Sequence, residues 1–376
     1  MGKHSVEVEK ETKVKEEKVG KEKNKKNKNG KKKHRLLKAF LIFLLIVILI
    51  LGVFAGVAWW YLNDKLNKVQ YEEIDKTKIG ISEEVKEELS GYRNIAILGI
   101  DSRADDYGLG NRSDCIIIAS INRKTNDVKM CSIYRDTYLQ VDNQSGNEIL
   151  DKITHAYAYG GAQNTLKALN TNLDMNIEEV VTVNFDAVVS AVDAIGGIDL
   201  YIDSEEVKYI NTYIRENNRV TGHNSSTITQ AGTYHVDGVQ ALAYSRIRYT
   251  AGGDYKRTER MRNVIDLMSK KCKTLGASEL NKVADTVLPL VRTNIQKNEI
   301  IGLIPKIASF NIVESIGWPD DTKGATIGGV WYGVPVTLES SVVDLHKKLF
   351  DQQDYVASDR VKDISQKIIT KSGYSK

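Results

Sequence analysis

The chain has 376 residues, of which 41% are hydrophobic, a length and composition typical of one large globular domain or two ordinary ones. The net charge of +4 averages two unlike parts, because thirteen lysines, one arginine and six glutamates give residues 1–35 a charge of +8. The chain from residue 39 onward is mildly acidic, at about −5, which argues against a general nucleic-acid-binding protein.

The amino-terminal part is expected to anchor the protein in a membrane. Residues 39–62 form an uncharged stretch of 24 residues, and a helix of this length spans a hydrocarbon core of roughly 30 Å. Trp59 and Trp60 lie at its far end, where aromatic side chains favour the membrane–water interface. The lysine-rich residues 1–38 are expected to be a disordered cytoplasmic tail, because basic flanks stay on the cytoplasmic side. Residues 63–376 should then lie outside the cell membrane, in a single-pass protein.

The cysteine count indicates no disulfide framework. Exported domains that depend on disulfides usually carry an even number of cysteines, whereas this chain has Cys115, Cys131 and Cys272. Cys115 and Cys131 flank a predicted hairpin whose register leaves their thiol groups out of line. We expect all three cysteines to be unpaired, and no cysteine–histidine spacing resembles a zinc site.

Strands and helices are expected to alternate along the exported part. Residues 63–90 are polar, with weak helical spacing, and we interpret them as an extracytoplasmic stalk. Beyond them, apolar runs that end in turn residues predict strands, and apolar residues at helical spacing predict helices. In chain order we expect strands at residues 93–101, 114–122 and 128–136, a helix at 164–173, a strand at 179–185, a helix at 186–197 and a strand at 198–202.

The second half continues this alternation. A helix leading into a strand is expected over residues 239–248, and a helix over 256–275. Residues 279–290 and 299–309 are predicted to be amphipathic helices with wide apolar faces. This order predicts an α/β fold, a three-layer α-β-α sandwich with a central mixed sheet, preceded by one transmembrane helix. Residues 316–376 are expected to form a C-terminal extension with a strand and a helix.

Arginines and aspartates accumulate where the predicted strands end, and loops at such places carry the sites of many α/β folds. One isolated Arg–Asp pair is usually a surface salt bridge, but a set of them at strand ends indicates a binding site. Guanidinium groups suit phosphate oxygens, and carboxylates among them suit a hard divalent cation such as magnesium. The residues that we single out are Asp101, Arg103, Arg112, Asp114, Arg135, Arg246, Arg248, Asp254, Arg257 and Arg260.

Four of these arginines lie close together in the sequence. Arg246 and Arg248 are expected on one face of a strand, because side chains two positions apart point the same way. In the following helix Arg257 and Arg260 are three apart and share a face, whereas Arg262 should point elsewhere. The first four are therefore predicted to converge on one pyrophosphate group.

His155 is the only histidine among these motifs. A structural hydrogen bond beside packed tyrosines is a better interpretation of it than a general base. Tyr157 and Tyr159 alternate with alanines, and we expect them to pack rather than to take part in chemistry.

Several ordered blocks of the chain resemble the LytR-CpsA-Psr family of Gram-positive cell-envelope proteins. They lie between about Ile95 and Ile304 and read "ILGIDSR", "NRSDCIIIASIN", "SIYRDTYL", "KITHAYAYGG", "VNFDAVVSAVDAIGGIDL", "GVQALAYSRIR" and "DYKRTERMRNVI". We assign residues 91–315 to the catalytic domain of such a protein. The resemblance implies a phosphotransferase that moves a glycopolymer, a teichoic acid or a capsular polysaccharide, from an undecaprenyl-pyrophosphate carrier to N-acetylmuramic acid of peptidoglycan.

The resemblance also implies roles for single residues. Asp101 and Asp114 match aspartates at a magnesium site, and most of the arginines match residues that contact the pyrophosphate. Either Asp101 or Asp254 could accept the proton of the acceptor hydroxyl. The expected catalytic set is Asp101, Arg112, Asp114, Arg135, Arg246 and Arg248, and the expected substrate-binding set is Arg103, Asp254, Arg257 and Arg260. The lipid tail is expected in an apolar tunnel, with residues 279–290 and 299–309 as candidates for its wall.

Two other functions remain open at this point. A polyprenyl-pyrophosphate hydrolase that uses water as the acceptor would need the same motifs. A non-catalytic envelope regulator that binds polyprenyl phosphate would need the binding residues alone.

Overall fold

The computed structural model describes residue 64 and residues 66–102, 107–303, 306 and 309–375. Internal contacts divide the chain into Met1–Asp64 and Lys65–Lys376, and the fold below is that of the second unit. The expected cytoplasmic tail and the expected spanning helix at residues 39–62 lie outside the described residues. None of the helices in the described ranges is long and apolar enough to cross a membrane.

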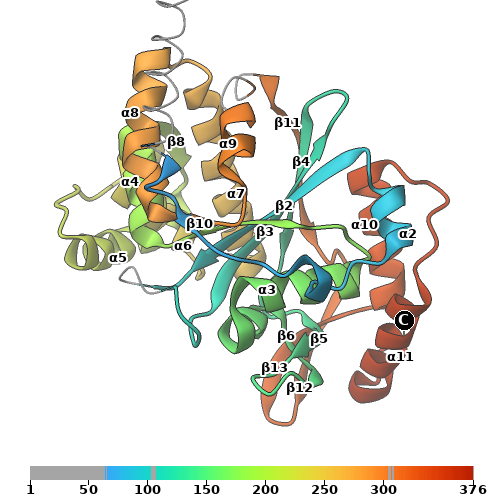
Figure 1. Ribbon diagram of the computed structural model, residues 1–376. Helices are drawn as coiled ribbons and strands as arrows, with labels where there is room; N and C mark the ends of the chain where they lie inside the picture. Colours follow the sequence, from blue (N-terminus) through green and yellow to red (C-terminus); the bar gives the residue numbers. More distant parts are fainter. Residues whose placement is uncertain (1–63, 65, 103–106, 304–305, 307–308, 376) are drawn as a thin grey trace, which may run out of the picture. The chain divides into compact units, whose positions relative to one another are not determined.

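A mixed β-sheet forms the centre of the fold (Figure 1). Three of its neighbouring pairs, β1–β10, β7–β2 and β4–β11, are parallel, and the other three are antiparallel. The expected central mixed sheet is therefore confirmed. In spatial order the strands are β1 (Gln70–Tyr71), β10 (Val291–Thr293), β7 (Glu179–Val183), β2 (Tyr92–Ile100), β3 (Ser113–Asn122), β4 (Asp127–Ile133) and β11 (Asn311–Trp318).

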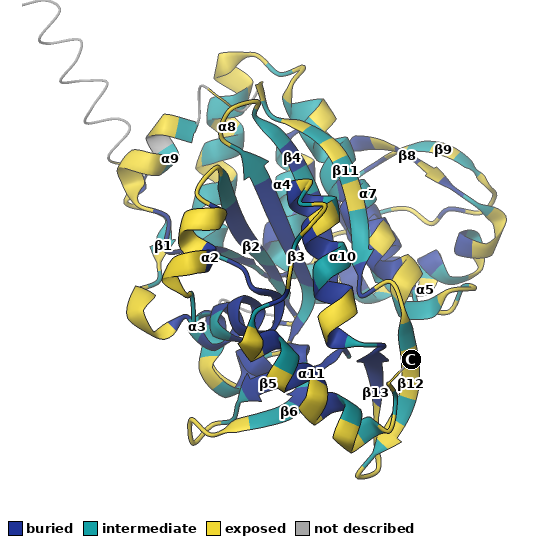
Figure 2. Ribbon diagram, turned by 90° about the vertical axis from the view of Figure 1, so that its right-hand side faces the viewer, coloured by how far each residue is buried: buried dark blue, intermediate teal, exposed yellow. Residues whose placement is uncertain are grey.

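Helices cover both faces of this sheet. Side chains alternate between the two faces along each strand, and because the central strands are apolar on both faces, each face needs a covering layer. Leu98 and Ile100 point into the larger core, where α2 (Glu83–Glu88), α3 (Ile153–Leu173), α10 (Leu338–Phe350) and α11 (Asp359–Ser372) pack. Ile97 and Ile117 point to the opposite face, against Ile265 of α7 (Gly253–Cys272). Figure 2 shows the central strands β2 and β3 largely buried between these layers.

A second core lies beside the sheet and consists mainly of helices. It contains α4 (Phe185–Ala194), α5 (Ser204–Thr221) and α6 (Gly238–Arg246), and the hairpin of β8 (Ile198–Ile202) and β9 (Gly232–Val236). Strand 198–202 was expected from the sequence, but it pairs only with β9 and forms no part of the central sheet.

Local sequence signals explain why these helices begin and end where they do. Asp203 caps the first turn of α5 and Glu206 bonds back to the Asp203 amide, which is a complete capping box. Gly222 ends the same helix at φ 72°, a left-handed conformation that glycine adopts at little cost. In α3 the residues Gly160 and Gly161 depart from helical geometry and kink the helix.

The remaining elements are short and lie around the two cores. Two further hairpins pair β5 with β6 and β12 with β13, and α8 follows α7 along the chain. Their bounds are β5 (Tyr138–Asp142), β6 (Glu148–Lys152), β12 (Thr322–Ile327), β13 (Val330–Pro335), α8 (Ala277–Val287), α9 (Lys297–Leu303) and the 3-10 turns η1 (Lys76–Lys78) and η2 (Leu288–Leu290).

Three expectations about organisation differ from the structure. The segment expected to be a stalk contributes Ile79 and Leu89 to the larger core, because its apolar residues are spaced to face α3 and the sheet. Strand β11 crosses the boundary expected between residues 315 and 316, since it pairs with β4 in the central sheet. The strand expected at Arg246–Arg248 does not form, and α6 ends at Arg246 instead. All three cysteines are free, as expected.

Candidate functional site

A β-bulge at the ends of β2 and β3 positions the first carboxylate of the site. Gly99 lies opposite Cys115 and Ile100 lies opposite Ser113, so Asp114 is the extra residue of the bulge. A bulge turns a side chain out of the regular alternation and is frequent next to active sites. Both Asp101 and Asp114 donate their backbone N–H to one carbonyl group, that of Arg112, at 3.3 and 3.1 Å. The two predicted aspartates therefore lie at neighbouring strand ends.

Asp114 is surrounded by guanidinium groups. Its Oδ1 lies 2.7 Å from Nη1 of Arg135, and its Oδ2 lies 3.1 Å from Nη2 of Arg248. Arg257 donates from Nη2 to the backbone carbonyl of Asp114 at 3.0 Å and has Nη1 3.8 Å from its Oδ2. Burial alone would raise the pKa of Asp114, but the charges of Arg135, Arg257 and Arg248 outweigh burial and lower it.

Two further aspartates complete this group, which we call the Asp114 cluster (Asp114, Arg135, Asp136, Arg248, Asp254 and Arg257). Asp254 accepts from Arg257 at 2.9 Å, and Asp136 is paired with Lys152 at 2.8 Å. Burial lowers the pKa of Arg257, which is 1% exposed. The Nε atoms of Arg135 and Arg257 are buried, and neither has a hydrogen-bond partner among the described residues. The side chains of Arg135 and Arg248 remain 22% and 38% exposed, and guanidinium groups that are open to solvent suit an anionic ligand with several oxygens.

Arg246 lies apart from this cluster because it ends a helix. Its Nη1 donates to Asn217 at 2.5 Å and its Nη2 lies 3.3 Å from Glu216. Its guanidinium group also packs over the rings of Phe185 and Tyr213, at 4.7 and 5.4 Å. Arg248 follows two residues later in the loop and turns toward Asp114 instead, so the two arginines do not share the face of a strand.

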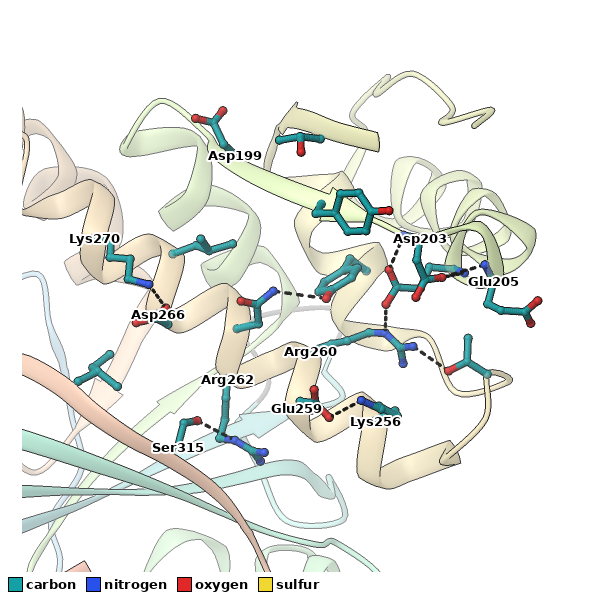
Figure 3. A pocket seen from close by; sticks show the side chains of 18 of the residues that line it. Asp199, Asp203, Glu205, Lys256, Glu259, Arg260, Arg262, Asp266, Lys270 and Ser315 are labelled. Carbon is teal, nitrogen blue, oxygen red and sulfur yellow. Dashed lines mark hydrogen bonds and ion pairs between the residues drawn. The ribbon is translucent and has the colours of Figure 1, made fainter. Parts of the chain in front are cut away.

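Arg260 and Arg262 both point to a different part of the molecule. Figure 3 shows them on the α7 wall of a groove of about 1000 Å³ that also involves β8, α5 and β11. Arg260 donates from Nε to Glu206 at 2.7 Å and from Nη1 to the carbonyl of Ile247 at 3.1 Å. Arg262 donates to Ser315 at 2.9 Å. The expected convergence of four arginines is therefore wrong. Arg248 and Arg257 both reach Asp114. Arg246 and Arg260 bind other partners, and that of Arg260 is a buried glutamate.

The other expected residues are located as follows. Asp101 and Arg112 are exposed, and neither forms an ion pair with another described residue. Arg103 lies outside the described residues. Nδ1 of His155 donates a hydrogen bond of 2.9 Å to Asp151, to which Tyr159 also donates, and the structural interpretation of His155 stays a prediction.

An apolar cavity of about 240 Å³ begins at the cluster. Asp114 and Arg246 line it at the polar side, and the rest of its wall comes from the sheet and from α4, α6 and α7. Among the described residues of the two expected wall helices, Val287 of α8 is the one that lines this cavity. The main apolar side chains of the wall are those of Ile97, Phe185, Leu242, Ile265 and Met268.

A magnesium ion can be tested against the side chains present. Within the described residues no group of three or more His, Cys, Asp or Glu side chains is close enough to hold a metal ion. Of the two expected ligands, Asp101 is exposed and both oxygens of Asp114 already face guanidinium groups. This donor set fits a cation that takes one or two carboxylates from the protein and its other oxygens from a bound phosphate, as magnesium often does.

Several residues of the site were not singled out by sequence reasoning. Glu206, Asn217 and Phe185 contact expected residues, and Lys152 contacts Asp136, which was not expected either. The spacing of Asp203 and Glu206 signals a helix start, but it carries no information about a partner 54 positions away. These contacts join distant segments and have no local sequence signal.

The fold and the site together define an α/β domain with an arginine–carboxylate cluster at the end of an apolar cavity. The chain belongs to the LytR_cpsA_psr family, whose model matches residues 57–348. The resemblance noted from the sequence blocks is thereby confirmed.

Comparison with individual proteins agrees with this family. The chain is 33% identical over 226 residues to the polyisoprenyl-teichoic acid–peptidoglycan teichoic acid transferase TagT of Bacillus subtilis, a match that spans 59% of this chain and 66% of that protein. It is 30% identical to a transferase of the same kind, TagU of Bacillus cereus, over 79% of this chain and 91% of that protein. The solved structure of TagT bound to LI-WTA aligns with a TM-score of 0.50 and 25% identity, over 80% of this chain and 94% of the other.

Proposed function

We propose that the chain is a membrane-anchored, extracytoplasmic phosphotransferase. It moves a glycopolymer, a teichoic acid or a capsular polysaccharide, from undecaprenyl pyrophosphate to N-acetylmuramic acid of peptidoglycan. The observation that carries this proposal is the Asp114 cluster at one end of the apolar cavity. A pyrophosphate joined to a hydrocarbon chain has the same arrangement, an anionic head followed by an apolar tail. The relatives named above as teichoic acid transferases support the proposed reaction.

The proposed reaction is a displacement at phosphorus. The oxygen of an acceptor hydroxyl attacks the phosphorus that carries the glycopolymer, the bond from this phosphorus to the bridging oxygen breaks, and polyprenyl phosphate leaves. The chief requirement of such a reaction is positioning and neutralisation of charge on the phosphate oxygens. Arg135, Arg248 and Arg257 supply this positive charge. The hydroxyl proton passes to a carboxylate, for which Asp101 and Asp254 are both candidates.

Magnesium is part of the proposal. Asp101 and Asp114 would hold it together with oxygens of the bound pyrophosphate, and when bound it would supply further neutralisation of charge. The membrane anchor is also proposed, on the uncharged residues 39–62 and the basic segment before them. This arrangement keeps the site near the leaflet that holds the headgroup of the lipid carrier.

The experiment is a transfer assay with the full chain in liposomes. The donor is a polyprenyl-pyrophosphate-linked saccharide, the acceptor is peptidoglycan, and the assay is run with magnesium and with a chelator. We expect glycan on peptidoglycan and polyprenyl phosphate as products. Arg248→Gln should lower transfer about a hundredfold, the usual effect of removing one donor that stabilises a charged transition state. The matched control is Arg219→Gln, since Arg219 is an exposed arginine of α5.

The same assay separates the alternative functions. Release of the saccharide phosphate into water at the same rate with and without peptidoglycan would indicate a hydrolase. Binding of the lipid without any turnover would indicate an envelope regulator. Equal transfer in the presence and absence of the chelator would remove magnesium from the proposal and leave the phosphotransferase assignment in place.

A further inference from the structure

A second hollow adjoins the Asp114 cluster, since Asp136 and Asp254 of the cluster line it. It has a volume of about 320 Å³, at the lower end of the range of ligand pockets. Three separate segments form it: the loop after β4, the first turn of α7 and the hairpin β12–β13. The side chains that line it are those of Tyr134, Asp136, Asp254, Tyr255, Thr322 and Trp331.

Two aromatic rings in this hollow are open to solvent. Trp331 is 51% exposed and Tyr255 is 43% exposed. Single exposed aromatic side chains are common on proteins, but two that line the same hollow offer apolar surface to one ligand. The surface is available because the hairpin β12–β13 brings Trp331 to the start of α7, where Tyr255 lies.

Both rings are held in place by their neighbours. The ring of Tyr255 packs edge-on against that of Tyr134 at 4.4 Å, and its hydroxyl shares a hydrogen bond with Thr322. Trp331 lies across the hairpin over Gly324, where a Cβ atom would come within 3.0 Å of the indole nitrogen. A glycine at this position therefore lets the indole lie close to the strand. Rings that are already ordered bind a ligand with a smaller entropy cost.

The polar side of the hollow belongs to the Asp114 cluster. Asp254 is paired with Arg257 at 2.9 Å and Asp136 is paired with Lys152 at 2.8 Å. The backbone carbonyl of Asp136 also accepts from the amide of Gly333, which ties β13 to the cluster. Because both carboxylates are already neutralised, they can accept hydrogen bonds from hydroxyl groups without attracting a cation.

We propose that this hollow binds the acceptor sugar of the transfer reaction, a pyranose ring of a glycan chain. The apolar C–H face of the ring packs on Trp331 and Tyr255, and its hydroxyl groups reach Asp136 and Asp254. A flat aromatic surface beside hydrogen-bond acceptors matches a ring that is apolar on its faces and polar at its edge. A cationic ligand fits less well, since Lys152 lies 6.0 Å from the centre of the Trp331 ring.

This inference rests on the proposed function and adds to it the position of the second substrate. The donor pyrophosphate occupies the guanidinium groups around Asp114, and the acceptor lies on the other side of Asp254. A hydroxyl of the bound sugar is then next to the carboxylate that contacts Arg257. The hairpin β12–β13, which lies beyond the boundary expected from the sequence, becomes part of the site.

The experiment measures glycan binding and transfer separately with the full chain in detergent. The binding probe is a fluorescently labelled oligosaccharide of alternating N-acetylglucosamine and N-acetylmuramic acid, followed by anisotropy. We expect Trp331→Ala to weaken its binding about tenfold, as loss of an aromatic stacking contact does. Trp331→Phe should recover most of the affinity because it keeps a flat ring. Tyr201→Ala, which removes a 63% exposed ring elsewhere, is the matched control and should bind as the wild type does.

The transfer assay gives a second, independent readout. Trp331→Ala should raise the KM for the acceptor about tenfold and leave the affinity for polyprenyl pyrophosphate unchanged. Equal oligosaccharide binding by the wild type and by Trp331→Ala would overturn the acceptor subsite, whatever the transfer assay gives. Absence of any turnover in a wild type that still binds the oligosaccharide through Trp331 would overturn the proposed function instead. The two failures are therefore distinguishable.

Discussion

Arg248 and Asp114 are 134 positions apart in the chain, and Nη2 of Arg248 lies 3.1 Å from Oδ2 of Asp114. Asp114 comes from a bulge at the end of a central strand, and Arg248 comes from the loop after α6. The loop brings the arginine to the same carboxylate that Arg135 contacts from the other side. One aspartate therefore joins segments that are far apart in the sequence, and the site forms only when the chain is folded.

The first prediction concerns the charge of Asp114. Asp114→Asn removes the carboxylate that Arg135, Arg248 and Arg257 share. Their positive charge is then less neutralised, so these arginines should bind an anion at least as well as before. We expect polyprenyl pyrophosphate to bind with equal or higher affinity in the absence of magnesium, while transfer in its presence falls about a hundredfold. Lipid binding and transfer are measured on the same preparation. Full turnover by the variant would show that this carboxylate has no part in the reaction.

The pH dependence of stability provides a second prediction. The pKa of Asp114 is lowered in the folded state, from an ordinary value of 3.8. A lowered folded-state pKa contributes stability that is fully present above the ordinary value and is lost as the pH falls through the folded-state value. We expect the melting temperature of the wild type to fall more steeply below about pH 4 than that of Asp114→Asn. Parallel curves in this range would contradict the ion pairs of Asp114.

A third prediction concerns the buried pair of Glu206 and Arg260, whose charged atoms lie 2.7 Å apart. Arg260 also bonds to the carbonyl of Ile247 and the hydroxyl of Thr250, so it holds the loop that carries Arg248. Arg260→Met alone should lower the free energy of unfolding by about 3 kcal/mol, because it leaves a buried carboxylate unpaired.

The control for this pair is the double variant. Glu206→Leu combined with Arg260→Met should be more stable than Arg260→Met alone, since no unpaired charge remains. Urea unfolding of the single and double variants measures the difference. Additive losses from the two substitutions would mean that the two side chains do not interact.

Arg262 supports a fourth prediction because it is buried and forms no ion pair with a carboxylate in the part of the chain that the structure describes. It is 7% exposed, its Nη1 has no hydrogen-bond partner among the described residues, and burial lowers its pKa. Arg262→Gln should leave the free energy of unfolding unchanged or raise it by about 1 kcal/mol, since the cost of burying a charge is removed. Arg257→Gln, on the same helix, should lower it by about 3 kcal/mol because Arg257 is paired with Asp254. A loss at Arg262 as large as that at Arg257 would contradict this distinction.

The apolar cavity leads to a fifth prediction. Ala191 of α4 lines it, and Ala191→Phe would place a ring in the space proposed for the lipid chain. Cavity filling often leaves a fold as stable as before or raises its stability by about 1 kcal/mol. We therefore expect an unchanged or higher melting temperature together with loss of octaprenyl phosphate binding. Ala277→Phe, at an exposed position of α8, is the matched control and should bind the lipid normally.

Much of the fold follows from local patterns in the sequence. The runs at residues 93–101, 114–122 and 128–136 became β2, β3 and β4 with ends that differ by at most three residues, because an apolar run bounded by turn residues is contained in the sequence of the strand itself. The helix expected at residues 256–275 became α7 for the same kind of reason. The strand expected at residues 198–202 formed as well, but pairing with β9 rather than the central sheet depends on contacts outside the strand.

The sequence predicted the kinds of residue that meet at the candidate site, but only some of the individual residues. Asp114, Arg135, Arg248 and Arg257 do come together, and each stood beside a strand end or a helix start in the sequence. Arg260 was expected with them because it lies three residues after Arg257 on the helix. A long arginine side chain can turn to either side of its helix, and a buried glutamate from α5 decided the direction.

The sequence by itself determined the α/β class, the alternation of strands and helices, the family and the kinds of residue at the site. These follow from periodicity, from composition and from ordered blocks, all of which are local along the chain. Only the tertiary structure decided which arginines meet Asp114, where the apolar cavity begins, and that the hairpin β12–β13 places Trp331 beside Asp254. The physical reason is that each of these contacts joins segments that lie far apart in the chain, and no local sequence pattern indicates which segments will meet. Burial and charge pairing decide which side chains pair only when the chain has folded.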